Sequence, residues 1–287
     1  MTEQKIALIT GASSGIGFEL TKQLAAKGYK IYAAARRTGP IKPLEEQYRD
    51  LIIPVQLDVS DPAQIVALRE RFETELPDGK LHILYNNAGQ SCTLPALDLT
   101  NDAIEQVFKV NVFGPMNLCR EMSQFVINSR GTILFTGSVA GLMPFPFGSA
   151  YASTKAAIHQ YARVLHGEMK LFGVRVINVI TGGVKTDIAD KRSIPEDSLF
   201  NTPEGRPALE YRKHMSDNNH PMSADAYVRE VIKDIERSYD PVDVYLGTFS
   251  SIAYWIYKFA PYPLLEWVLR RRFKLDGIYN SFKRKND

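Results

Sequence analysis

The sequence predicts an α/β fold in which a doubly wound parallel sheet carries helices on both faces and an amphipathic helical segment follows. Short apolar runs alternate with helical patterns from residue 5 to residue 180. Such alternation is typical of βαβ units and a parallel sheet. The first apolar run ends in a glycine-rich turn, TGASSGIG, at residues 10–17. A turn of this kind between the first strand and the first helix favours a sheet of the Rossmann type.

The expected elements follow one another in a regular order. Strands are expected at the apolar runs of residues 5–10, 29–35, 81–89, 131–138 and 174–180. Helices are expected where apolar side chains recur with helical spacing, at residues 17–28, 61–76, 101–128 and 151–172. The sheet is expected to close with VDVYLG, which ends at residue 247.

The chain divides into one main domain and a C-terminal segment. The main domain spans residues 1–248. Within it, residues from about 187 to 223 are polar and carry four prolines, so they predict a lid over a site rather than part of the sheet. Residues 249–287 form the C-terminal segment, which is apolar at first and basic at its end.

Composition and charge exclude several classes of protein. The 287 residues are 45% hydrophobic and 23% charged, which argues against a disordered chain and against a multi-span membrane protein. Cys92 and Cys119 form no disulfide framework and indicate a reducing compartment. The net charge of +3 divides into +5 within residues 270–287 and −2 elsewhere. No aromatic platform or recognition helix accompanies this basic tail, so nucleic acid is not an expected partner.

The turn TGASSGIG matches two motifs with different chemistry. From Thr10 it is a glycine turn for a dinucleotide, and within residues 11–15 it is GxSxG, the nucleophile elbow of ester hydrolases. In the hydrolase fold the oxyanion hole uses a loop after an earlier strand, and the residues before Gly11 leave no room for that strand. Position therefore favours the dinucleotide, whose pyrophosphate would meet the backbone N–H groups at the start of the helix.

Four polar side chains form a candidate catalytic set. Tyr151 and Lys155 stand four residues apart on an expected helix and so share one face. An ammonium group beside a phenol favours the phenolate and lowers the phenol pKa, which suits the tyrosine to proton transfer. Ser138 ends a strand, where its hydroxyl can bind a substrate carbonyl, and Asn111 lies within the preceding helix.

These motifs, in this order and approximate spacing, resemble those of the short-chain dehydrogenases/reductases. The resemblance rests on TGASSGIG, NNAG at residues 86–89, Asn111, Ser138 and the pair Tyr151/Lys155. It implies an oxidoreductase that acts on a CH–OH or C=O group with a nicotinamide cofactor. It also implies that Tyr151 is the general acid and that Lys155 binds the nicotinamide ribose and tunes the tyrosine. Ser138 would hold the carbonyl, and Asn111 would anchor a water of a proton relay.

The same resemblance implies which residues bind the cofactor. They lie in the glycine turn, in NNAG, on the catalytic helix and after the expected strand of residues 174–180: Gly11, Ser13, Ser14, Gly15, Ile16, Gly17, Asn87, Ala88, Gly89, Lys155, Val184 and Thr186. Asp58 resembles the family's adenine-contacting acid, with turn capping as the alternative. The family commonly has Pro-Gly where this chain has Thr181 and Gly182, a departure that bears on the geometry of that loop. We assign no metal site.

The end of the second expected strand predicts which nicotinamide cofactor is used. An acidic residue there would accept the ribose 2′-OH of NAD, whereas arginine suits the 2′-phosphate of NADP. The sequence is YAAARR, with Arg36 and Arg37 and no carboxylate. A guanidinium group can pair bidentately with phosphate, so we expect NADPH, with two surface arginines as the alternative.

Within the family, the chain is most similar to a fungal group that reduces the ketone of 1-acyldihydroxyacetone phosphate, an acylated lipid that carries phosphate. LYNNAGQSCT, KAAIHQYAR, ITGGVKTDIADKR and DPVDVYLGTF carry this likeness. The product implied is 1-acylglycerol 3-phosphate. Six basic residues in or next to the lid suit a phosphate: Lys185, Lys191, Arg192, Arg206, Arg212 and Lys213.

Two alternatives for the activity stay open. One is the reduction of a steroid, a retinoid or another lipid ketone. The other is ester hydrolysis by Ser13, for which Glu168, Asp187 and His214 follow in a workable order.

The C-terminal segment predicts contact with a lipid surface. Residues 252–269 contain both tryptophans and precede a run of arginines, while Lys258 and Pro261 interrupt any span. Aromatic residues favour the headgroup region, and arginines attract anionic lipid. We therefore expect residues 252–274 to bind a membrane or a lipid droplet, on the cytosolic face of the endoplasmic reticulum. A pair of helices that covers the pocket, or the interface of a homo-oligomer, is the alternative.

Overall fold

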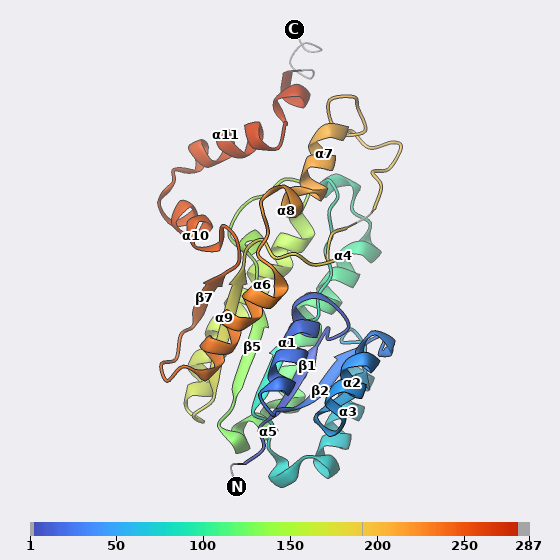
Figure 1. The fold of residues 1–287 in the computed structure, drawn as a ribbon. Coiled ribbons are helices and arrows are strands. Elements are labelled where there is room, and N and C mark those ends of the chain that lie inside the picture. The colour runs from blue at the N-terminus through green and yellow to red at the C-terminus, as the bar shows by residue number, and fades with distance from the viewer. Residues whose placement is uncertain (1–2, 191, 281–287) are drawn as a thin grey trace.

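A seven-stranded parallel sheet forms the centre of the molecule (Figure 1). The computed structural model describes residues 3–190 and 192–280, with the backbone alone for residues 216 and 217. The predicted main domain and C-terminal segment therefore extend outside the described residues, at 1–2 and at 281–287. The strand order is β3-β2-β1-β4-β5-β6-β7. The strands are β1 (Ile6–Thr10), β2 (Lys30–Ala35), β3 (Ile52–Gln56), β4 (Ile83–Asn86), β5 (Thr132–Thr136), β6 (Arg175–Thr181) and β7 (Asp243–Leu246). This confirms the predicted fold class.

Helices cover both faces of the sheet because the strands are apolar on both sides. Leu8 of β1 packs with α3, α5 and α6, whereas the next residue, Ile9, packs with α1, α2 and α9. The first layer consists of α3 (Pro62–Glu75), α5 (Gly114–Ser129) and α6 (Ser149–Lys170). The second consists of α1 (Gly15–Ala26), α2 (Lys42–Tyr48) and α9 (Ala224–Glu236). Successive residues point to opposite faces of a strand, so one buried strand supplies two cores.

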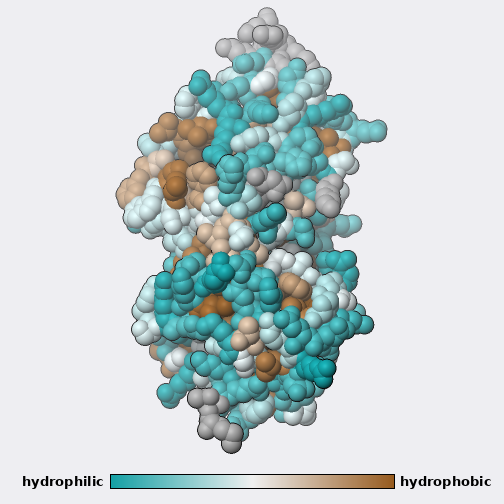
Figure 2. Space-filling view, viewed as in Figure 1, coloured by the Kyte–Doolittle hydropathy of each residue, from teal (hydrophilic) through white to brown (hydrophobic). Residues whose placement is uncertain are grey.

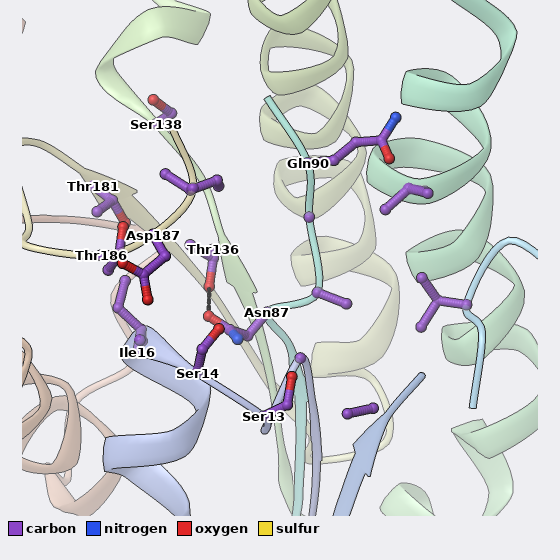
Figure 3. Close-up of a pocket in the computed structure, with 18 of the residues that line it drawn as sticks. Ser13, Ser14, Ile16, Asn87, Gln90, Thr136, Ser138, Thr181, Thr186 and Asp187 are labelled. Atoms are coloured by element: carbon purple, nitrogen blue, oxygen red, sulfur yellow. Dashed lines mark hydrogen bonds between the residues drawn. The ribbon is translucent and has the colours of Figure 1, made fainter. Parts of the chain in front are cut away.

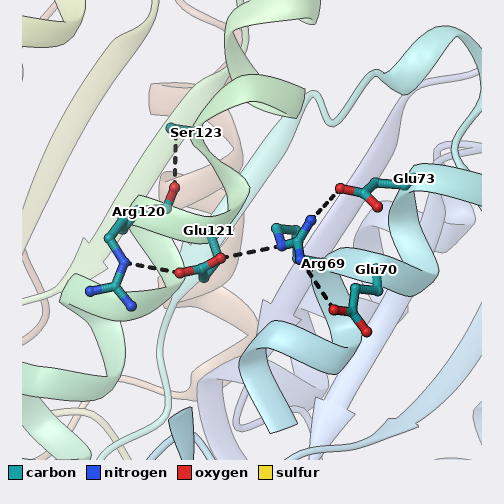
Figure 4. Close-up of polar contacts among 6 residues, drawn as sticks. All are labelled: Arg69, Glu70, Glu73, Arg120, Glu121 and Ser123. Carbon is teal, nitrogen blue, oxygen red and sulfur yellow. Dashed lines mark hydrogen bonds and ion pairs between the residues drawn. The ribbon is translucent and has the colours of Figure 1, made fainter. Parts of the chain in front are cut away.

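An ionic network joins two neighbouring helices of the first layer, α3 and α5 (Figure 4). Arg69 of α3 places Nε 3.3 Å from Glu121 Oε2 of α5, and it also pairs with Glu70 and Glu73 of its own helix. Arg120 holds the second oxygen of Glu121 at 2.9 Å. Exposed pairs of this kind contribute only about 0–1 kcal/mol each, so the apolar core rather than this network holds the helices on the sheet.

Strand β3 was not among the strands expected from the sequence. Pro54 lies in its middle, opposite Ala33 of β2, and proline has no N–H to donate. β3 is at the edge of the sheet and has one neighbour, so a proline is tolerated there. Helices α2 and α9 were not expected either.

Smaller helices complete the molecule at both ends of the strands. α4 (Asn101–Phe108) continues through a π-helical stretch (Lys109–Phe113) into α5, so the expected helix of residues 101–128 is three joined pieces. Short 3₁₀ helices lie at Gly39–Ile41, Arg49–Leu51, Pro77–Gly79, Ala96–Asp98 and Val139–Gly141. The stretch expected to be a lid contains α7 (Arg206–Lys213) and α8 (Met215–Asn218).

The C-terminal segment consists of two helices with a break between them, which confirms the predicted helical segment. α10 (Ser250–Phe259) and α11 (Tyr262–Arg272) are separated at Pro261. Both lie beyond the sheet, on the side of α7 and α8 (Figure 1). No helix in the described ranges is long and apolar enough to cross a bilayer.

Candidate active site

Two adjoining cavities lie at the carboxyl ends of the strands. The first has a volume of about 370 Å³ and runs from the turn after β1, past the ends of β2 and β4, to α6 (Figure 3). The second, of about 1040 Å³, opens beside it under α10 and α11. Ser138 and Tyr151 line both cavities. In open α/β sheets, ligands bind at this edge, where the strand order reverses, here between β1 and β4.

The turn between β1 and α1 leaves backbone exposed to the first cavity. Gly11 has φ of +67°, a conformation that favours glycine. A Cβ on Gly17 would lie 2.4 Å from the Gly11 carbonyl oxygen, so only glycine lets the helix approach the turn so closely. Ser14, the N-cap residue, makes no side-chain cap. The N–H groups at the start of α1 are therefore available to an anion such as a pyrophosphate.

Thr10, Asn87 and Thr136 join the ends of three strands. The Thr10 hydroxyl oxygen accepts hydrogen bonds from the backbone N–H groups of Asn87 and Ala88, both at 3.0 Å. Asn87 Nδ2 donates to the Thr10 carbonyl oxygen at 2.9 Å. The Thr136 hydroxyl donates to Asn87 Oδ1 at 3.1 Å (Figure 3). These bonds fix the floor of the cavity.

Arg36, Arg37 and Asp58 line the end of the first cavity that lies away from Tyr151. No carboxylate among the described residues pairs with either arginine. Asp58 Oδ1 accepts hydrogen bonds from the Ser60 N–H at 2.9 Å and the Ser60 hydroxyl at 2.7 Å. Asp58 therefore caps a turn, which was the alternative for it, and it also lines the cavity; its contact with adenine stays a prediction.

Tyr151 and Ser138 are brought together by α6 and the end of β5. Burial raises the pKa of the Tyr151 phenol above its ordinary value, while a hydrogen bond with Ser138 and the charge of Arg212 lower it. Because the effect of burial is the largest, the phenol is protonated at neutral pH. The structure thus adds Arg212, which the sequence did not single out, to the surroundings of the tyrosine.

Lys155 is buried one helical turn beyond Tyr151. Its Nζ donates to the Thr136 carbonyl oxygen at 2.7 Å and lies 5.7 Å from the centre of the Tyr151 ring. Burial lowers the pKa of Lys155 to about 8. The ammonium form therefore persists at neutral pH, but Lys155 holds its proton less tightly than a solvated lysine does.

Asn111 lies behind the cavity rather than in its wall. It sits in the π-helical stretch, where its Oδ1 accepts from the Gln90 N–H at 2.9 Å and its Nδ2 donates to the Gln90 carbonyl oxygen at 3.0 Å. Nδ2 also donates to the Thr154 hydroxyl at 3.0 Å. The side chain thus anchors the loop after β4 against α6. Its predicted role toward a relay water stays a prediction.

Every other residue predicted to bind the cofactor lines the first cavity except Gly17, which underlies the turn. The departure at Thr181 has a structural reason. Its hydroxyl lies 2.6 Å from the Tyr227 hydroxyl of α9, in the core, and the loop beyond it still brings Val184 and Thr186 to the cavity wall. The threonine replaces the usual proline with a buried hydrogen bond.

His159 was missed by the sequence analysis although it positions the Ser138 loop. Its Nε2 accepts a hydrogen bond from the Ser138 backbone N–H at 3.0 Å. Burial, with the charges of Lys155 and Arg163, lowers the pKa of His159 to about 3. Only the neutral imidazole can accept this bond. Nothing in the local sequence distinguishes His159 from other helix residues, because its partner lies 21 residues away.

α10 and α11 contribute apolar side chains to the wall of the second cavity: Ala253, Ile256, Leu264, Leu265, Val268 and Leu269. The lid stretch also contributes to its wall, at residues 187–190, 212, 213, 215, 219 and 223. The C-terminal segment thus covers the pocket, as one of its predicted alternatives proposed.

Ser13 has no histidine partner. It lines the first cavity, and no histidine among the described residues lines that cavity with it. His214, the base considered for a hydrolase, lies within 3.8 Å of Glu210 and lines neither cavity. Glu168 is on the exposed side of α6. The candidate triad is therefore not assembled, and the hydrolase alternative is not favoured.

Comparison with known proteins agrees with this geometry. Residues 5–197 match the family model described as short chain dehydrogenase. A relative from Saccharomyces cerevisiae, an NADPH-dependent 1-acyldihydroxyacetone phosphate reductase, is 58% identical over 283 residues, 98% of this chain and 95% of its own. A reductase of the same name from Schizosaccharomyces pombe is 31% identical, covering 80% of this chain and 76% of its own.

Solved structures also match the fold. A short-chain dehydrogenase from Streptomyces avermitilis has a TM-score of 0.80 at 25% identity, covering 95% of this chain and 99% of its own. One from Burkholderia cenocepacia, in complex with NADP, has a TM-score of 0.72 at 21% identity, covering 94% and 98% of the two chains.

His159 predicts an acid-labile contribution to stability. The pKa of His159 in the folded chain lies below the ordinary value of 6.5. Between these two pKa values the imidazole is protonated in the unfolded chain and neutral in the folded chain. This contribution is fully present above pH 6.5 and is lost as pH falls toward 3. The free energy of unfolding, measured by urea denaturation, should therefore fall less steeply with decreasing pH in His159→Gln, by about 1.4 kcal/mol per pH unit.

The exposed His214 supplies the control, since His214→Gln removes an imidazole from the surface rather than from the core. Parallel curves for the wild type and His159→Gln between pH 4 and 6 would contradict the assignment.

Proposed function

The chain belongs to the short-chain dehydrogenase/reductase family, and we propose that it reduces the ketone of 1-acyldihydroxyacetone phosphate with NADPH to give 1-acylglycerol 3-phosphate. The observation that carries the proposal is the 58% identity across 98% of the chain to the yeast reductase of that name. The two cavities support it, because one suits a dinucleotide and the other is large and apolar enough for an acyl chain. Neutral lipid ketones are the less favoured alternative.

The residues present fit NADPH. The glycine turn offers backbone N–H groups to the pyrophosphate, and a side chain on Gly17 would close that approach. Arg36 and Arg37 suit the 2′-phosphate, because guanidinium groups bind phosphate through two parallel hydrogen bonds. The Lys155 ammonium lies 5.7 Å from the centre of the Tyr151 ring and would bind the ribose. When bound, NADPH supplies the hydride.

Ser138 and Tyr151 handle the ketone oxygen. The Ser138 hydroxyl binds the oxygen, held in place by the bond from its backbone N–H to His159. Tyr151 is protonated at neutral pH because burial raises its pKa, so it can donate its proton to the oxygen as negative charge develops there. The cations of Lys155 and Arg212 then favour the phenolate that remains.

We also propose that α10 and α11 lie in the surface layer of a membrane or lipid droplet, at the cytosolic face of the endoplasmic reticulum. Trp255 is 56% exposed, Phe259 69% and Tyr262 64%. Figure 2 shows apolar side chains gathered at the upper left, where these helices lie in Figure 1. Exposed apolar patches of this kind mark interaction sites, and aromatic residues with nearby arginines favour a lipid headgroup region. A homo-oligomer stays a prediction.

Tyr151→Phe tests the catalytic assignment. The variant lacks the proton donor, so NADPH oxidation with 1-palmitoyl-dihydroxyacetone phosphate should fall by about 10²- to 10⁴-fold, the usual contribution of general acid catalysis. NADPH binding, measured by fluorescence titration, should stay unchanged. If the wild type binds NADPH but does not oxidise it with this lipid, the substrate is wrong; if Tyr151→Phe keeps full activity, the proton donor is wrong.

Arg36→Asp tests the cofactor assignment. The substitution removes a phosphate ligand and adds a carboxylate that accepts hydrogen bonds from the 2′-OH of NADH. The ratio of kcat/KM for NADPH to that for NADH should fall by at least about tenfold, which corresponds to about 1.4 kcal/mol. Arg49→Asp, an arginine elsewhere on the surface and outside the cavity, serves as the control. An unchanged ratio in Arg36→Asp would contradict the role of Arg36.

The double variant Trp255→Ser, Phe259→Ser tests the lipid contact. Both rings are exposed and stack on each other with 5.6 Å between their centres, so their loss should lower binding to phosphatidylcholine–phosphatidylserine vesicles by at least about tenfold. Vesicle flotation measures this. Phe172→Ser removes an aromatic ring of similar exposure, 52%, from the end of α6, and should float as the wild type does. Equal flotation of all three proteins would count against the proposal.

A further inference from the structure

The larger cavity has four cationic side chains in its wall, and only one of them, Lys213, has an acidic partner among the described residues. They are Lys185, Arg212, Lys213 and Arg272. Lys213 Nζ lies 3.2 Å from Glu210 Oε1. Arg272 Nη2 donates to Asn219 Oδ1, and its guanidinium lies 5.6 Å from the centre of the Phe249 ring. Lys185 is exposed. Arg212 is the cation that stands beside the catalytic groups.

Arg212 lies in the last turn of α7, next to the N-terminal end of α6. Its Nε donates to the Pro146 carbonyl oxygen at 3.2 Å. A Cβ on Gly148 would lie 3.1 Å from its Nη2, so glycine leaves room for the guanidinium there. Tyr151 follows three residues after Gly148, on the first turn of α6. The single bond at Nε fixes the plane of the guanidinium and leaves both Nη groups without a partner within the described ranges.

The surroundings of Arg212 leave its charge uncompensated. No carboxylate of the described chain lies within ion-pair distance of it. Two acids line the same cavity, Asp187 and Asp190. The Asp190 carboxylate is already engaged by the N–H groups of Thr93 at 2.6 Å and Arg192 at 3.0 Å, and Asp187 is exposed. Burial lowers the pKa of Arg212, and Tyr151 counteracts this only in its ionised form.

Arg212 is partly buried, and a cation withdrawn from water without an anionic partner is stabilised when a ligand supplies the negative charge. The substrate of the proposed reaction carries that charge in the required place. In 1-acyldihydroxyacetone phosphate, one carbon and one oxygen separate the ketone carbon from phosphorus. When the ketone oxygen is at Ser138 and Tyr151, the phosphate must therefore lie close to them. Arg212 is the cation at that position.

We propose that Arg212 binds the phosphate of the substrate and thereby places the ketone against Tyr151. The inference rests on the proposed function and adds the residue that selects a phosphorylated ketone. It separates this phosphate from that of the cofactor, whose arginines, Arg36 and Arg37, line the other cavity. It also gives a reason for rejecting neutral ketones such as steroids, since these would leave the partly buried Arg212 without an anionic partner.

The test compares a phosphorylated and a dephosphorylated substrate. NADPH oxidation is measured with 1-palmitoyl-dihydroxyacetone phosphate and with 1-palmitoyl-dihydroxyacetone for the wild type, Arg212→Gln and Arg212→Lys. Arg212→Gln should lower kcat/KM for the phosphorylated lipid by about 10- to 100-fold, as for loss of a charge-assisted hydrogen bond. The value for the dephosphorylated lipid should fall by a smaller factor, because that reaction loses only the effect of the Arg212 charge on Tyr151. Arg212→Lys should restore part of the loss.

Arg206→Gln is the matched control. Arg206 is the first residue of the same helix, its Nε donates to Asn201 Oδ1, and it lines neither cavity, so both substrates should be reduced as by the wild type. If Arg212→Gln lowers kcat/KM for both lipids equally, Arg212 acts on Tyr151 or on folding and the phosphate assignment is overturned.

A binding measurement separates this outcome from failure of the proposed reaction. Calorimetry with the product-like lipid 1-palmitoylglycerol 3-phosphate, in detergent with NADP⁺ present, requires no turnover. Loss of affinity for this lipid in Arg212→Gln, with unchanged affinity for 1-palmitoylglycerol, supports the phosphate site even if the wild type oxidises no NADPH with the ketone. Equal affinities in Arg212→Gln and the wild type overturn the site even if the reaction is confirmed.

Discussion

The whole site depends on the hydrogen bonds between Thr10 and the backbone after β4, which hold the carboxyl ends of β1 and β4 together. β1 and β4 are neighbours in the sheet, although 72 residues lie between Thr10, the last residue of β1, and Ile83, the first residue of β4. The helices that follow these two strands pack on opposite faces of the sheet. The Thr10 hydroxyl accepts a hydrogen bond from the Asn87 backbone at the end of β4, and the Asn87 side chain accepts one from Thr136 of β5. The Thr136 carbonyl oxygen in turn receives the Lys155 ammonium at 2.7 Å. The glycine turn, the cavity floor and the catalytic helix are thus placed by one connected set of bonds.

Burial around this set determines the charge of each catalytic group. It raises the pKa of Tyr151 and lowers those of Lys155, His159 and Arg212. The phenol is therefore a proton donor and His159 a neutral acceptor, while both cations lack a carboxylate partner in the part of the chain that the structure describes. A site with excess positive charge suits negatively charged ligands. If the proposed function is right, the cofactor and the substrate both carry phosphate.

Sequence patterns predicted the parts of this site that are local along the chain. The spacing of Tyr151 and Lys155 and the glycine turn are each set within a few residues, and the parallel sheet follows from the alternation of elements. Strand β3 was missed because Pro54 is acceptable only at an edge, and the edge is a property of the assembled sheet. His159 was not identified, and Arg212 was named only as one of six basic residues near the lid, because their roles come from contacts across 21 and 66 residues. The GxSxG letters also fit a hydrolase; their position favoured a dinucleotide, and among the described residues no histidine lines the first cavity beside Ser13.

The two C-terminal helices have one face of exposed aromatic residues and another that lines the larger cavity. A segment with a single role would need only one of these faces. A segment that only closed the cavity would bury its aromatic residues, yet Trp255 and Phe259 are more than half exposed. A segment that only anchored the chain would have no reason to line the cavity, yet Leu265 and Leu269 are buried in its wall. Each methylene of an acyl chain costs about 0.8 kcal/mol when it is moved from lipid into water. On the proposed membrane contact, helices that touch both the lipid layer and the cavity shorten the path on which the acyl chain would meet water, which makes the anchor part of substrate binding.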